Sequence, residues 1–411
     1  MRYKDIWKIN AYRWNLIAGM IGRLGDSIDM IGFSWMMYGL TESTFYTAVV
    51  FGVNMLPTIL FQPFAGAMIE QLSKKKIIVV CDFARSFLIL MVLLLYLGNK
   101  LNPLFLLFVT FFNNLLESFR MPAGTCFLAD TLSKETYESG VGLYQSASRA
   151  CELVGTGIAG VIISCFGIGG ALVCDMIAFF LCAVIISRVY LVESNEALKV
   201  NCKESIQSTM SQLKGGIHYL ISKKSVFLIS IIASLINAGL VPLNSFESAY
   251  VRGSLQGSAI LLSGLSLCIS CGAIFGSFMF PYFHKLLNKR LLLSIGIAIG
   301  GYNIVLAGIP FCNDNMWRII ILLCCSLIIG IMSGCGSVLV ASSFMVHVEK
   351  SYLARVSAIF NSVASAFLPI LSFLVAFLSK RLNILPIFLG FGLIFIVIFV
   401  LLFRLKEMEE I

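Results

Sequence analysis

Three charged residues with helical spacing lie inside an apolar stretch of the sequence. Arg23, Asp26 and Asp29 recur every third residue in GRLGDSIDM, within a segment that runs from about Trp14 to Leu40. Side chains three positions apart share one face of a helix, so the spacing predicts a charged face. In a bilayer that face must turn toward protein or water, because a charge at the membrane centre costs about 2.5–3.5 kcal/mol or more. The chemistry open to such residues is proton or substrate binding.

The composition predicts that this stretch does cross a membrane. Of the 411 residues, 59% are hydrophobic and 12% are charged. A soluble protein is about one quarter charged, and a spanning helix needs roughly 20 mostly apolar residues. The sequence contains twelve such segments, at 14–40, 44–69, 77–98, 104–130, 140–166, 169–190, 225–249, 258–283, 291–311, 318–346, 353–378 and 385–404. We therefore expect an all-α membrane protein with 12 transmembrane helices.

The positions of Lys and Arg predict the orientation of these helices. With the N-terminus inside, the cytoplasmic segments would be 1–13, 70–76, 131–139, 188–224, 284–290, 347–355 and 404–411. These segments hold 21 of the 30 basic residues, and the outer loops hold five. Cytoplasmic loops of membrane proteins are enriched in Lys and Arg, so both termini are expected to be cytoplasmic. This asymmetry accounts for the net charge of +9 without a nucleic-acid partner.

The longest polar segment divides the chain into two halves. Residues 192–224 are predicted to be a cytoplasmic linker between an N-terminal six-helix bundle (1–191) and a C-terminal one (225–411). Two such halves are the layout of secondary transporters, in which substrate binds near the membrane midplane. The sequence contains no G-x-x-x-x-G-K-[ST] phosphate loop, so ATP hydrolysis by that route is excluded.

Three carboxylates on different helices are expected to reach the same depth. Asp26 lies twelve residues along the first span, which is about 18 Å at 1.5 Å per residue. Glu117 lies thirteen residues into the fourth span, and Glu152 twelve residues into the fifth. All three are thus predicted near the midplane, where an ionisable residue is a candidate for function.

Each of these carboxylates has an arginine one turn away. Local ion pairs are therefore expected between Arg23 and Asp26, Arg120 and Glu117, and Arg149 and Glu152. Asp29 is left over, and a buried carboxylate without full pairing can bind and release a proton. The candidates for proton coupling or substrate binding are Asp26, Asp29, Glu117, Glu152, Arg23, Arg120 and Arg149.

The second half offers few charges for the same purpose. Candidates for a cavity wall there are Asn237, Asn244, Glu247 and Asn361. Phe and Met accompany them, and aromatic and Met surfaces accept varied shapes. Such a cavity suits an amphipathic, cationic compound.

The connection between the second and third spans carries a known signature. Residues 66–78 read GAMIEQLSKKKII. This resembles the G-x-x-x-D-[RK]-x-x-[RK]-[RK]-[RK] motif of the major facilitator superfamily, although Gln71 replaces a basic residue. The matching positions are Gly66, Glu70, Lys74, Lys75 and Lys76.

Other runs resemble the macrolide-efflux type of drug exporter, a branch that also contains siderophore exporters. They are GLTES at 39–43, FRMPA at 119–123, and the pair Asp82 and Arg85. The resemblance implies proton-driven export by alternating access and a cytoplasmic gate. We expect Asp82, Arg85 and Asp130 to belong to that gate with Glu70, rather than to the midplane site.

The sequence thus predicts a secondary transporter of the cell membrane, acting as a monomer on a small molecule and protons. The alternatives are an exporter of a specific natural product such as a siderophore or peptide, an importer, and a transport-dead sensor. Neither an enzyme nor a metal or other cofactor is expected. The 13 cysteines are scattered, and His218, His284 and His347 lack a metal or nucleophile–base spacing.

Overall fold

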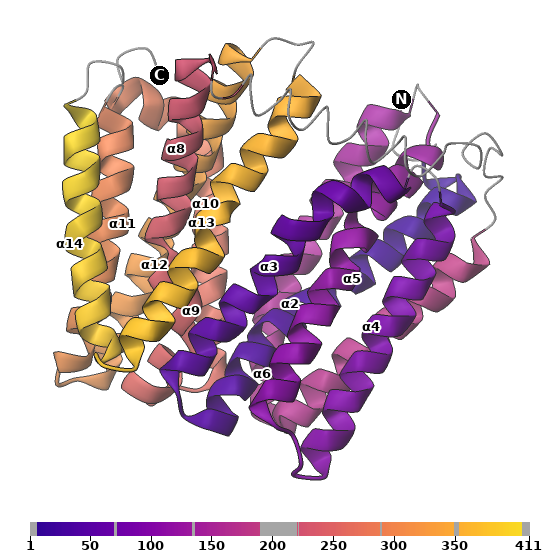
Figure 1. Cartoon of the computed structure of the whole chain (residues 1–411), viewed down its shortest axis with the longest axis horizontal. Coiled ribbons are helices and arrows are strands. Elements are labelled where there is room, and N and C mark those ends of the chain that lie inside the picture. The colour runs from indigo at the N-terminus through magenta and orange to yellow at the C-terminus, as the bar shows by residue number, and fades with distance from the viewer. Residues whose placement is uncertain are drawn as a thin grey trace. The chain divides into compact units, whose positions relative to one another are not determined.

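The computed structural model describes residues 6–69, 72–133, 136–189, 220, 222–287, 290–348 and 353–404. Throughout these residues the regular structure is helical (Figure 1). The chain forms two compact units, one from Met1–Leu40 and Val53–Met210 and the other from Thr41–Gly52 and Ser211–Ile411. We refer to them as unit 1 and unit 2. The predicted linker 192–224 lies mostly outside the described residues, so the predicted domain boundaries stay a prediction.

The helices of the first half are long. They are α2 (Asn10–Thr41), α3 (Thr44–Ile69), α4 (Lys74–Leu97), α5 (Pro103–Asp130) and α6 (Tyr137–Arg188). The 52 residues of α6 are interrupted at Gly167, whose φ of 70° is a left-handed conformation. Glycine adopts this conformation without a Cβ clash, and it divides α6 into two helical segments.

The second half contains shorter elements as well. They are α8 (Lys224–Gly239), α9 (Val241–Ala249), the π-helix η2 (Tyr250–Ser254), α10 (Ala259–Leu287), α11 (Arg290–Gly308), the 3-10 helix η3 (Ile309–Phe311), α12 (Asn315–His347), α13 (Leu353–Ser379) and α14 (Ile384–Phe403). The seventh predicted span, 225–249, is therefore divided between α8 and α9, and η2 follows it.

Ten helical segments within the described residues are long and apolar enough to cross a membrane. One of them, Ser139–Arg188, has 50 residues, more than the roughly 20 that one crossing needs. The charged helix α2 is 32 residues long but is not among the ten. A multi-pass helical membrane protein follows, while the count of 12 crossings stays a prediction.

Local signals explain where several helices begin. The Asn102 side chain accepts a hydrogen bond from the Leu104 amide, and Pro103 occupies the first helical turn of α5. Asp314 caps α12 in the same way through the Met316 amide. Polar side chains at these positions satisfy amide groups that the helix itself leaves unpaired.

Small residues let α10 and α12 pack closely within unit 2. A Cβ atom at Gly276 would collide with the Ile331 carbonyl oxygen, and one at Gly334 with the Ala273 carbonyl oxygen. Glycines four residues earlier, Gly272 and Gly330, face the opposite backbone in the same way. Two G-x-x-x-G patterns thus interlock, an arrangement that brings membrane helices into backbone contact.

We predict that Gly276→Ala lowers the stability of unit 2. The added Cβ would meet backbone, which cannot give way as a flexible side chain does, and overpacking of this kind costs about 1–3 kcal/mol. Thermal unfolding of the purified protein measures the change. Gly301→Ala in α11 is the matched control, because a Cβ there meets nothing within 4 Å. Equal stability of the two variants would contradict the proposed backbone contact.

Candidate functional site

Arg85 of α4 forms the centre of a buried polar cluster in unit 1. Its Nη2 atom lies 2.7 Å from Asp26 Oδ1 of α2, and its Nη1 atom lies 2.5 Å from Glu117 Oε2 of α5. The Arg85 side chain is 3% exposed, and the two carboxylates are 20% and 16% exposed. One guanidinium group therefore joins three helices through two charge-assisted hydrogen bonds.

The remaining faces of Arg85 are also occupied. Its Nε atom donates to Asn113 Oδ1 over 2.9 Å, and the Asn113 amide nitrogen donates to Asp29 Oδ2 over 2.7 Å. The guanidinium carbon lies 3.8 Å from the centre of the Phe179 ring of α6. Asn113 thus links Asp29 to Arg85, and the aromatic ring provides a cation–π contact.

A second buried ion pair joins α4 to α5. Arg120 Nε bonds Asp82 Oδ1, whose side chain is fully buried. The Arg120 side chain passes close to α2 at Gly22, where a Cβ would lie 3.0 Å from Arg120 Nη2. Glycine in GRLGDSIDM therefore makes room for a guanidinium group from another helix.

Carboxylates outnumber arginines in this part of unit 1. Asp175 of α6 is buried beside Gly25, and neither of its carboxylate oxygens has a hydrogen-bond partner among the described residues. Asp29 Oδ1 and Asp82 Oδ2 are likewise without partners there. We define the Arg85 cluster as Arg23, Arg85, Arg120, Asp26, Asp29, Asp82, Asn113, Glu117 and Asp175. With every group ionised it would hold five carboxylates and three guanidinium groups, an unbalanced charge that is costly to bury.

Two predicted site residues lie outside this cluster. Arg149 and Glu152 of α6 form their own ion pair at 2.9 Å, with side chains 71% and 44% exposed. Both side chains are therefore not enclosed by protein, unlike Arg85 and its partners. The structure thus brings Asp26 and Glu117 to a common arginine, while the Glu152 carboxylate pairs with Arg149 and the Glu152 backbone carbonyl oxygen accepts a hydrogen bond from Ser27, next to Asp26.

One of the three local ion pairs expected of the arginines was wrong, while those of Arg23 with Asp26 and Arg149 with Glu152 are present. Arg120 was expected to pair with Glu117 one turn away, but it bonds Asp82 instead, and Glu117 bonds Arg85. A fully buried carboxylate needs a cation more than a partly exposed one does, so the contact between helices is favoured over the local one. Arg23 does approach Asp26, at 3.7 Å, and it also donates to Met121 Sδ.

Asp82 and Arg85 were expected at a cytoplasmic gate, apart from Asp26 and Glu117, but Arg85 bonds both of those carboxylates. Arg85 is eleven residues from the start of α4 at Lys74, about 16 Å along the helix. Counted from the predicted start of its span at residue 77, as for Asp26, Arg85 would lie about 12 Å along, so the depth rule alone did not indicate this contact. Asn113 and Phe179 were missed as well, and no pattern in the sequence distinguishes them.

Other predicted gate residues lie around the start of α4. Lys74 Nζ bonds Asp130 Oδ2 over 2.6 Å, which ties the start of α4 to the end of α5. Lys75 Nζ donates to the Val189 carbonyl oxygen over 2.8 Å, and the Lys76 amide donates to the capping Ser73 hydroxyl. Gly66 lies in α3, and Glu70 lies outside the described residues.

The candidates in unit 2 do not form one group. Asn237 Nδ2 donates to the Ala364 carbonyl oxygen over 3.1 Å, and Glu247 accepts from the Ser266 hydroxyl over 2.6 Å. Asn244 is partly buried in α9, and Asn361 is exposed on α13. The carboxylate of Glu247 is the member with titratable chemistry.

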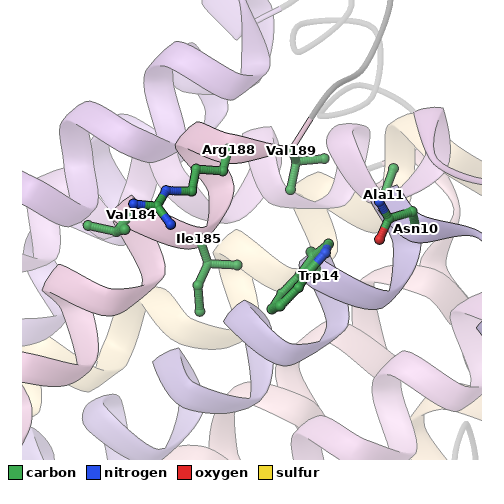
Figure 2. Close-up of a pocket in the computed structure, with 7 residues that line it drawn as sticks. All are labelled: Asn10, Ala11, Trp14, Val184, Ile185, Arg188 and Val189. Carbon is green, nitrogen blue, oxygen red and sulfur yellow. The ribbon is translucent and has the colours of Figure 1, made fainter.

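A pocket of about 360 Å³ lies in unit 1 (Figure 2). It is lined by Asn10, Ala11, Trp14, Val184, Ile185, Arg188 and Val189, from the start of α2 and the end of α6. No residue of the Arg85 cluster lines it. In the part of the chain that the structure describes, no group of three His, Cys, Asp or Glu side chains is arranged to hold a metal ion.

The chain matches the family model described as Major Facilitator Superfamily over residues 16–372. It belongs to this superfamily and is therefore an integral, multi-pass membrane transporter. The resemblance inferred from GAMIEQLSKKKII is confirmed by that match.

Relatives of known sequence include transporters and drug exporters. The chain is 24% identical over 314 residues to the uncharacterized MFS-type transporter YkuC of Bacillus subtilis, covering 74% of this chain and 72% of the relative. It is 19% identical to macrolide efflux protein A of Streptococcus pyogenes over 98% of both proteins. A staphyloferrin A transporter of Staphylococcus aureus is 21% identical over 164 residues, which is 39% of this chain and 41% of that protein.

Solved structures share the fold at low identity. The nucleoside transporter NupG superposes with a TM-score of 0.72 at 14% identity, over 97% of this chain and all of that one. A bacterial homologue of the iron transporter ferroportin, in an inward-facing state, gives 0.72 at 13% identity over 98% of this chain and 100% of the other. These similarities show the transporter fold and nothing about the substrate.

We predict that Arg85→Gln strongly destabilises unit 1. The substitution leaves Asp26 and Glu117 without their shared cation, and breaking a buried ion pair from one side costs about 3–5 kcal/mol. Thermal unfolding of the purified protein measures the loss. Arg149→Gln is the control, because its ion pair with Glu152 is not enclosed by protein and should contribute less than the pairs of Arg85.

A double substitution tests whether the destabilisation arises from the unpaired carboxylates. Arg85→Gln with Glu117→Gln removes a negative charge together with the positive one, so it should be less destabilised than the sum of the two single variants. Simple additivity would show that Arg85 and Glu117 are not energetically coupled.

Proposed function

We propose that this protein is a secondary active transporter that exports an amphipathic, cationic compound in exchange for protons. The observation that carries the proposal is the sharing of Arg85 between Asp26 and Glu117, on three different helices. A carboxylate within a membrane helix is costly and is retained where it carries protons or substrate. The partners are a small molecule, protons and the lipid bilayer.

The proposed coupling step is protonation of Asp26 or Glu117. A protonated carboxyl group loses its Coulomb attraction to Arg85, and the guanidinium then keeps one anionic partner instead of two. This changes which helices Arg85 ties together. A transporter that alternates between two access states needs a group of residues with two arrangements. A proton can shift the balance between these arrangements only if it binds one of them more tightly than the other.

The charge balance of the Arg85 cluster supports the same step. With five carboxylates against three guanidinium groups, the buried cluster becomes neutral when it holds two protons. Loss of protons would leave negative charge that attracts a cationic substrate. Protons and a cation would therefore compete for the same carboxylates, as exchange requires.

The names of the relatives support an amphipathic compound as cargo. Two proteins named macrolide efflux protein A, from Streptococcus pyogenes and Enterococcus faecalis, match 98% and 77% of this chain. We infer export of a macrolide-like drug, with 12 crossings, both termini cytoplasmic, a monomeric state and a place in the plasma membrane. The contact of Lys74 with Asp130 supports a cytoplasmic gate at the start of α4.

We predict that Asp26→Asn abolishes export driven by a pH gradient. The amide keeps the shape of the side chain but cannot bind and release a proton, so the coupling step is lost. Uptake of a fluorescent cationic drug into inside-out vesicles with an acidic lumen measures it, and the variant should match vesicles without the protein. Asp314→Asn is the control, because Asn caps a helix as well as Asp.

The outcome that contradicts this assignment is simple. If Asp26→Asn vesicles accumulate the drug at the wild-type rate on acidification, Asp26 does not couple protons to transport. A wild-type protein that accumulates no drug on acidification, while moving it in the opposite direction, would indicate an importer.

A second candidate function rests on Arg23. Its side chain is 34% exposed, and its ion pair with Asp26 is long at 3.7 Å. A partly exposed guanidinium with a weak partner can bind an anionic group. Together with the similarity to a staphyloferrin A transporter, this favours export of an anionic natural product such as a siderophore.

Arg23→Gln separates the two candidates. If the cargo is cationic, the variant should transport it at the wild-type rate or faster, because a repelling charge is removed. If the cargo is an anionic chelator, its transport should fall sharply while cationic drugs are unaffected. Parallel uptake of a cationic dye and an anionic siderophore in the same vesicles measures the difference.

A further inference from the structure

Glu247 is a carboxylate in an interrupted helix of unit 2. The helical segment α8 ends at Gly239, α9 runs from Val241 to Ala249, and the π-helix η2 follows directly. Pro242 lies in the first turn of α9, where its missing amide donor is tolerated. Interrupted membrane helices and π-helical turns are both frequent at functional sites.

The polar contacts of Glu247 indicate where a proton lies. The Ser266 hydroxyl oxygen of α10 is 2.6 Å from Glu247 Oε1 and 3.2 Å from the Leu262 carbonyl oxygen. The Ser266 hydroxyl group has one hydrogen, so it can form a good hydrogen bond to only one of these two acceptors. If Glu247 is protonated, its O–H donates to Ser266 and Ser266 donates to Leu262, so both contacts become hydrogen bonds.

The surroundings of Glu247 offer little to stabilise its negative charge. Among the residues that the structure describes, Glu247 forms no ion pair. The titratable group facing it from α11 is Tyr302, whose hydroxyl is 2.9 Å from Ser326, and Arg252 lies farther along in η2. Glu247 is partly buried, and a carboxylate in such a place without a nearby cation is costly when ionised and inexpensive when protonated.

We propose that Glu247 and Ser266 form a second proton-binding site, in unit 2, that is occupied by a proton in this conformation. On release, the Glu247 O–H bond breaks, the proton passes to water, and the Ser266 hydroxyl turns from the Leu262 carbonyl to the carboxylate. No arginine takes part, so this site differs chemically from the Arg85 cluster. A protonated amine of a substrate could replace the proton at the ionised carboxylate.

The site itself does not depend on the proposed function, but its use in coupling does. If both sites exchange protons during transport, substitution of Glu247 should lower the number of protons exchanged per substrate. Substitution of Asp26 in the Arg85 cluster should instead abolish coupling. The protonation of Glu247 can be measured without any transport.

Infrared difference spectroscopy of the purified full-length protein in lipid tests the site. The C=O stretch of a protonated carboxyl group is separate from the bands of carboxylates and amides. Glu247→Gln should remove one such band from the spectrum at neutral pH. Ser266→Ala should shift this band to higher frequency because the carboxyl group loses its acceptor, and Ser266→Thr should restore its position.

Glu42→Gln is the matched control, because Glu42 is exposed between α2 and α3 and should give no change at neutral pH. Spectra of Glu247→Gln that equal the wild type would overturn the proposal, as would a band that Ser266→Ala leaves in place. If the wild type shows no proton-driven transport while the Glu247 band is present, the proposed function fails and the proton site stands.

Discussion

The full burial of the Arg85 guanidinium is the constraint on which the interior of unit 1 depends. A guanidinium group is always charged in a protein, so the interior must supply compensating groups on every side. Asp26 comes from α2, Glu117 and Asn113 come from α5, and Phe179 comes from α6. The helices around Arg85 are therefore held together in part by carboxylates, and the charge of a carboxylate depends on whether it binds a proton.

This arrangement explains why charge and small residues occur together in GRLGDSIDM. Asp26 faces Arg85, while Gly22 makes room for Arg120 and Gly25 lies against Ala178 and Asp175 of α6. A larger residue at either glycine would push away the side chains that balance the charge. The same nine residues therefore supply both a ligand for arginine and the space that other helices need.

The two units use ionisable groups in different ways. Unit 1 concentrates several carboxylates around arginines, and these groups form ion pairs between helices. In unit 2, close backbone contacts at Gly276 and Gly334 join α10 to α12, and Glu247 lies beside a hydroxyl group. In the proposed coupling, loss of a proton in unit 1 restores a carboxylate partner to Arg85, whereas loss of a proton from Glu247 would leave an uncompensated negative charge.

The sequence by itself determined the class of the protein. Long apolar segments, the helix 2–3 signature and the three-residue spacing of Arg23, Asp26 and Asp29 identify a membrane transporter with a charged interior face. Only the tertiary structure decided that Arg120 pairs with Asp82 and that Arg85 joins Asp26 to Glu117. Neighbours along one helix are visible in the sequence, but the free energy of a buried charge depends on groups from other helices, whose rotation and depth the sequence does not specify.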